Sequence, residues 1–146
     1  MSRARRKRIG VSKEFIKLCA AFIKSQHSST QINLNNTEHG HVLLHVFKGS
    51  AFNQWEHVEQ KFPEHSSIIH IFFNKNKPRH EGTFEAFENT QLINDFTFVE
   101  EPAQSSYVKS VDSQNEYDLA EEIMGLYYLV YSNQLEDGYS FEAGLY

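Results

Sequence analysis

A short apolar run, IIHIFF at residues 68–73, places the strongest constraint on the fold of this chain. Serines precede the run and the polar stretch NKNK follows it, so it has the length of a strand rather than of a helix. A strand with apolar residues at adjacent positions has to be covered on both of its faces. The run therefore predicts a central strand of a sheet, with further strands beside it.

Patterns on either side of this run indicate helices and further strands. Ser12 is typical of a helix N-cap, and Phe15, Cys19 and Phe22 recur on one face of the residues that follow it. Pro63 is expected to end a second helix. The predicted helices begin after Ser12 and cover 51–62 and 115–134, and the predicted strands cover 29–36, 39–48, 66–74, 83–89, 96–100 and 106–111.

The order of these elements favours an α+β fold. Short loops join several of the strands, and helices do not alternate regularly with them, which predicts a single mixed or antiparallel sheet of about five to six strands covered by about three helices. With 146 residues the chain is long enough to bury one sizeable core. Like charges within SRARRKR repel one another, so residues 1–11 are predicted to form a disordered basic arm before a single domain at 12–146.

Charge is divided sharply along the chain. Residues 1–80 carry 13 Lys and Arg against 5 Asp and Glu, a balance of +8, whereas residues 81–146 carry 1 against 14, a balance of −13. All eight histidines lie in the basic half. The two halves are therefore expected to attract different partners.

The acidic half combines carboxylates with tyrosines, which suits the binding of a basic protein. Tyrosine supplies anchoring area and the acids guide the encounter. The leading hypothesis is a non-enzymatic protein-binding module, in its most concrete form an inhibitor or immunity-type protein that neutralises a basic toxin or nuclease. Its predicted partner-binding residues are Glu121, Glu122, Tyr127, Tyr128, Tyr131, Glu136, Asp137 and Tyr139.

A second hypothesis is a nucleic-acid-binding accessory protein. The basic arm and a basic loop after the central strand are suited to contact a phosphate backbone. Recognition of single strands also requires exposed aromatic rings, for which Phe72 and Trp55 are the candidates. The predicted nucleic-acid-binding residues are Arg3, Arg5, Arg6, Lys7, Arg8, Lys75, Lys77 and Arg79.

A third hypothesis is a metal-dependent enzyme. In a strand, alternate side chains share a face, so His39, His41 and His45 are expected on one side of the strand at 39–48, where His70 joins them if the two strands pair. Clustered imidazoles suit zinc, nickel or copper. The same pattern also occurs on an ordinary half-exposed sheet face, which the sequence favours.

Other chemistry has little support in the sequence. The chain contains no glycine-rich phosphate loop, no Gly-x-Ser-x-Gly and no His-Glu-x-x-His, so no catalytic residue and no cofactor is predicted. Cys19, the one cysteine, excludes a disulfide within the chain and indicates a reducing compartment. The apolar stretch around it contains Lys17 and is too short to span a bilayer. We therefore expect a cytoplasmic protein without a membrane partner.

Overall fold

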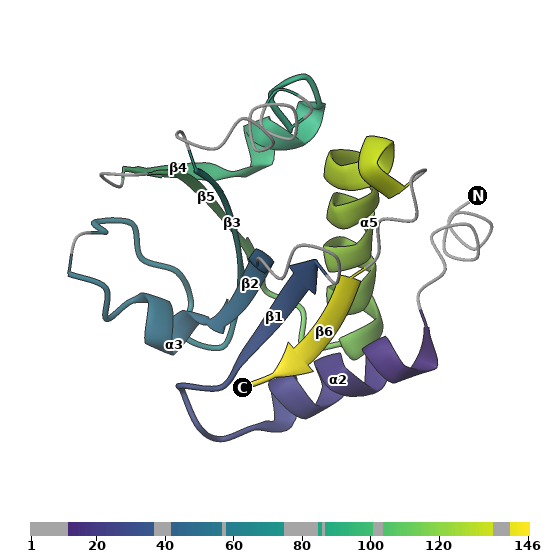
Figure 1. The fold of residues 1–146 in the computed structure, drawn as a ribbon. Coiled ribbons are helices and arrows are strands. Elements are labelled where there is room, and N and C mark those ends of the chain that lie inside the picture. The colour runs from purple at the N-terminus through teal and green to yellow at the C-terminus, as the bar shows by residue number, and fades with distance from the viewer. Residues whose placement is uncertain are drawn as a thin grey trace.

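The computed structural model describes residues 12–36, 42–56, 58–74, 85, 87–100, 104–135 and 141–146. Within these residues, one antiparallel sheet has the strand order β4-β5-β3-β2-β1-β6, and three α-helices pack against it (Figure 1). The predicted α+β class and single sheet are confirmed. The elements are α2 (Lys13–Lys24), β1 (Gln31–Asn36), β2 (Val42–Lys48), α3 (Gly49–Phe52), β3 (Ser67–Asn74), the 3-10 helix η1 (Gln91–Asp95), β4 (Thr97–Glu100), β5 (Gln104–Val111), α5 (Glu116–Leu135) and β6 (Phe141–Leu145).

The apolar run forms β3, which lies between β2 and β5 as a central strand. Its register pairs Ile69 with Val46 of β2 and with Lys109 of β5. Because side chains alternate along a strand, Ile69 and Ile71 face the helices while Ile68 and His70 face the other side. Both predictions for this segment, a strand and a central position, are confirmed.

Helices α2 and α5 lie on one side of the sheet, and the main core lies between them and the strands (Figure 1). Ser12 caps α2, since its Oγ accepts a hydrogen bond of 3.1 Å from the N–H of Phe15. Asn115 has the same role in α5, where its Oδ1 accepts from the N–H groups of Tyr117 (2.8 Å) and Asp118 (3.2 Å). The main buried residues are Phe15, Cys19, Phe22, Ile32, Leu34, Leu44, Val46, Ile69, Ile71, Phe87, Leu119, Ile123, Met124 and Tyr127.

The helix predicted over 51–62 is wrong, because α3 ends at Phe52. The side chain of Asn53 then closes a loop: its Nδ2 donates to the carbonyl of Phe62 at 2.7 Å, and its Oδ1 accepts from the N–H of Phe62 at 3.0 Å. These bonds replace the helical ones. A smaller apolar cluster results on the face opposite α2 and α5, where Phe52 and Val58 pack with Ile68.

Two further predictions need correction. The strand predicted over 83–89 is wrong: Glu85, Phe87 and Glu88 are helical, and Phe87 packs edge-on to Phe96. The acidic tail after α5, for which no strand was predicted, contains β6. This strand pairs with β1 through Ile32 opposite Leu145 and adjacent pairs.

None of the helices described in the structure combines the length and the apolar character needed to cross a membrane.

Candidate functional site

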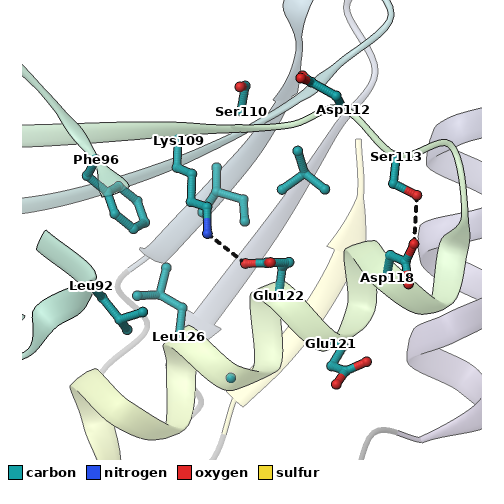
Figure 2. Close-up of a pocket in the computed structure, with 13 residues that line it drawn as sticks. Leu92, Phe96, Lys109, Ser110, Asp112, Ser113, Asp118, Glu121, Glu122 and Leu126 are labelled. Atoms are coloured by element: carbon teal, nitrogen blue, oxygen red, sulfur yellow. Dashed lines mark hydrogen bonds and ion pairs between the residues drawn. The ribbon is translucent and has the colours of Figure 1, made fainter. Parts of the chain in front are cut away.

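A pocket of about 630 Å³ lies between α5, β5 and η1 on the helix side of the sheet (Figure 2). Apolar side chains from η1 and α5 form one end of it, where Leu92 and Leu126 lie near Phe96. Charged and polar side chains from the end of β5 and the first turns of α5 form the other. Its lining residues are Ile69, Leu92, Phe96, Lys109, Ser110, Val111, Asp112, Ser113, Asp118, Glu121, Glu122, Gly125 and Leu126.

The carboxylates in this lining outnumber the cations. Asp112, Asp118, Glu121 and Glu122 all belong to the lining, which contains one basic residue, Lys109. Figure 2 shows that Glu122 is the carboxylate that reaches the ammonium of Lys109. The nominal charge of the lining is thus negative, with four acids against one base. Low-dielectric walls on one side strengthen the attraction of such a site for a cation.

One ion pair spans the pocket from the sheet to the helix. Nζ of Lys109 on β5 lies 3.0 Å from Oε2 of Glu122 on α5, with side-chain exposures of 22% and 45% respectively. Figure 2 shows this pair between the apolar end at Phe96 and the polar end at Asp118. Ser113 donates to Asp118 at 2.8 Å and thereby fixes that carboxylate at the start of α5.

Gly125 is an unusual residue for the middle of a twenty-residue helix. Glycine costs about 1 kcal/mol relative to alanine at such a position. A Cβ added there would meet no other atom within 4 Å, so close packing does not require glycine. Its effect is to leave the wall of the pocket open beside Leu126.

The structure brings together only part of the predicted partner-binding set. Glu121 and Glu122 both line the pocket. Tyr127 is fully buried in the main core, where it cannot reach a partner, and Tyr128 is half-buried, edge-on to Tyr127 at 5.7 Å. Tyr131 lies on α5, but its side chain is outside the described residues, as are Glu136, Asp137 and Tyr139.

Sequence reasoning missed most of the pocket. Asp118, Glu121, Glu122 and Gly125 follow helical spacing and so share a face of α5, which the sequence already indicates. Lys109 is also conspicuous as the only base after residue 80. No local pattern, however, indicates that η1 brings its leucine and Phe96 to the same place.

The histidine cluster is partly described. His45 and His70 pair directly across β2 and β3, with ring centroids 5.8 Å apart, on the face opposite α2 and α5. Nδ1 of His45 lies 2.7 Å from Oδ1 of Asn33, which can only accept, so Nδ1 carries the proton and Nε2 is an acceptor in the neutral ring. Burial lowers the pKa of His45 and favours this neutral form.

Aromatic rings surround these histidines. His45 stacks with Phe47 at 5.3 Å and with Phe72 at 5.6 Å, and Trp55 lies edge-on to His70 at 5.7 Å. Phe47, Phe72 and Trp55 are all half-buried. We call the surface formed by His45, Phe47, Trp55, His70 and Phe72 the aromatic face.

The metal hypothesis stays a prediction. His39 and His41 lie outside the described residues. Among the residues that are described, no group of three or more histidine, cysteine, aspartate or glutamate side chains is placed to hold a metal ion.

The basic residues of the second hypothesis also lie outside the described part of the chain. They are Arg3, Arg5, Arg6, Lys7, Arg8, Lys75, Lys77 and Arg79.

Comparison with known proteins does not extend these observations: no family model, no curated protein and no solved structure matches this chain.

Proposed function

We propose that this chain is a non-enzymatic binding module that holds a basic protein in the pocket between α5, β5 and η1. The observation that carries the proposal is the lining itself, which is apolar at one end and includes Asp112, Asp118, Glu121 and Glu122 over the rest of the pocket. An arginine or lysine side chain has the same two parts, an aliphatic stem and a cationic head. The pocket therefore fits a basic side chain together with an apolar neighbour from the same partner.

The most concrete form of the proposal is an inhibitor or immunity-type protein that neutralises a toxin or nuclease in the cytoplasm. A nuclease needs a basic surface to bind phosphates, and an inhibitor that covers this surface needs the opposite charge. The balance of −13 over residues 81–146, which supply all of the pocket lining except Ile69, favours such a target. The acids guide the encounter, while the apolar end supplies contact area.

Charge reversal tests the proposal. Lysate from the source cell is treated with nuclease and passed over the immobilised wild-type chain, the double variant Glu121→Lys/Glu122→Lys, and the control Glu142→Lys. Glu142 is an exposed glutamate on β6, outside the pocket. We expect a basic protein that binds wild type and the control, but not the double variant. Equal retention by all three chains would contradict the proposal.

A charge-neutral variant separates the pocket from the general acidity of the surface. Gly125→Leu extends a side chain into the open wall without changing any charge. Partner affinity should fall by roughly tenfold or more, because the inserted side chain occupies the space that a partner needs. Gly125→Ala is the matched control with little added volume. Unchanged affinity of Gly125→Leu would place the contact elsewhere on the protein.

The aromatic face favours a second candidate function, the binding of single-stranded nucleic acid. Phe72 and Trp55 are both half-buried on one face of the sheet, and bases stack on partly exposed rings of this kind. Labelled single-stranded oligonucleotides test this function by titration at increasing salt. Binding should weaken with salt, on substitution Phe72→Ala and on deletion of residues 2–8. The absence of binding at low salt would exclude this function, and binding that survives both Phe72→Ala and the deletion would place the contact away from the aromatic face and the basic arm.

A further inference from the structure

The cation already present in the pocket, Lys109, provides information about the ligand. It is the only Lys or Arg among residues 81–146 of the sequence. Its position on β5, opposite Ile69, puts its side chain on the helix side of the sheet. Figure 2 shows it extending from β5 to Glu122, between Phe96 and the polar end of the pocket.

The ion pair made by Lys109 is easily exchanged. Nζ lies 3.0 Å from Oε2 of Glu122, and 22% of the lysine side chain and 45% of the glutamate side chain are exposed, so water reaches both partners. An ion pair with this exposure contributes at most about 1 kcal/mol. A partner's cation can therefore replace Lys109 beside Glu122 at small cost, whereas a deeply buried pair would resist exchange.

We infer that Lys109 is an internal placeholder for the basic side chain of a partner, and that its ammonium leaves Glu122 when the partner's cation enters the pocket. The inference rests on the proposed function and names the ligand more closely: a protein segment with an arginine or lysine next to an apolar residue. The cation takes Glu122, and the apolar residue takes the end formed by Leu92 and Phe96.

The inference predicts in which direction the affinity for the partner changes when Lys109 is replaced. If Lys109 were a partner contact or only a structural brace, its removal would weaken binding or leave it unchanged. As a placeholder it competes with the ligand and repels it, so Lys109→Met should bind roughly two- to fivefold more tightly. Methionine keeps most of the aliphatic stem while removing the charge.

The probe is a fluorescein-labelled peptide of alternating leucine and arginine, titrated by anisotropy into four chains: wild type, Lys109→Met, Glu122→Gln and Glu142→Gln. A peptide of alternating leucine and glutamate is the specificity control. We expect tighter binding by Lys109→Met, weaker binding by Glu122→Gln, and no change for Glu142→Gln, which lies outside the pocket. Thermal melts of each chain verify that it is folded, and Lys109→Gln serves if Lys109→Met is not.

The outcomes of this titration distinguish the placeholder role of Lys109 from the proposed function of the pocket. Wild-type binding of the arginine peptide with equal or weaker binding by both Lys109 variants overturns the placeholder and leaves the proposed function standing. No preference of any chain for the arginine peptide over the glutamate peptide overturns both. An NMR signal of the Lys109 ammonium that moves on saturation with the arginine peptide, and not with the glutamate peptide, supports the exchange; a signal that does not move contradicts it.

Discussion

The two faces of the sheet are made by the same strands but are covered in different ways. The helix side is aliphatic on β2 and β3, with Leu44, Val46, Ile69 and Ile71 fully or almost fully buried beneath α2 and α5. The opposite side carries the aromatic face, in which His70 is buried and the other four rings are half-buried. Two long helices cover the helix side. On the other side, α3 and the loop after it bury Phe52 and Ile68 completely but leave the rings of the aromatic face partly exposed.

The difference teaches where this molecule can interact. The covered face opens to solvent at one margin, where the pocket lies between α5 and β5 (Figure 2). The aromatic face offers flat, half-exposed rings close to two histidines. The two surfaces also come from different halves of the sequence, since the pocket uses residues after 80 except for Ile69 and the aromatic face uses residues before 80.

The largest expected effect is the difference in reactivity of Cys19, which lies in the core on the helix side, between the folded and the unfolded chain. Burial, with a smaller effect of the Glu116 carboxylate, raises the pKa of the Cys19 thiol from 9.0 to about 12. The reactive thiolate is then about a thousandfold scarcer than in an exposed cysteine. We expect iodoacetamide at pH 8 to leave the folded chain unlabelled and to label it rapidly in guanidinium, as measured by mass spectrometry. Equal labelling in both states would show that the helix side opens readily.

Adjacent residues of β3 test the contrast in packing energy. Ile71 is fully buried on the helix side, and Phe72 is half-buried on the aromatic face. Ile71→Ala should lower the free energy of unfolding by about 2–4 kcal/mol, and Phe72→Ala by about 1–2 kcal/mol because less of its surface is withdrawn from water. Denaturant titration of both variants measures the difference. A larger loss for Phe72→Ala would reverse the comparison.

Lowering the pH should reduce the stability of the protein through His45 in the aromatic face. Burial holds the pKa of His45 below its ordinary 6.5, so between the lowered value and 6.5 the unfolded state binds more protons than the folded state. Stability should therefore fall as pH drops through about 6.5, by at most about 1.4 kcal/mol per pH unit from this residue.

Melting temperatures between pH 7.5 and pH 5 provide the measurement. The His45→Phe variant should lose part of the pH dependence, while His27→Gln, at an exposed position, is the matched control. An unchanged pH dependence in His45→Phe would exclude His45 as its source.

The smallest expected effect is at the pocket wall. Gly125→Ala adds a methyl group that meets no atom within 4 Å and removes a helix-interior glycine. Stability should rise by about 0.5–1 kcal/mol. Denaturant titration checks this expectation. A loss of stability would mean that the wall at Gly125 is more tightly packed than the structure describes.

Local sequence patterns were sufficient to predict those elements whose structure depends mainly on their own residues. Ser12, the stripe through Phe15, Cys19 and Phe22, and the apolar run of β3 predicted α2 and the central strand correctly. The α+β class followed from the order of the elements. Local signals failed where a distant residue decides, as when Asn53 bonds both backbone groups of Phe62 and ends the helix predicted over 51–62.

Strand β6 and the pocket were missed for a related reason. FEAGL has two apolar ends around a charge, an alanine and a glycine, and it becomes a strand only because the outer edge of β1 accepts it. Glu121 and Glu122 were predicted as site residues from charge alone and do line the pocket. Its apolar end depends on η1 meeting α5, which no spacing in the sequence encodes.

The pairing of β1 with β6 also has a consequence for synthesis. A ribosome releases residues 31–36 long before residues 141–145, so a nascent chain can join β1 to β2 while the other edge of β1 has no strand to accept. Contacts so distant in sequence form slowly, and a bare edge is a template for other chains. Translation speed and chaperone access should therefore influence the yield of this protein more than its modest size suggests.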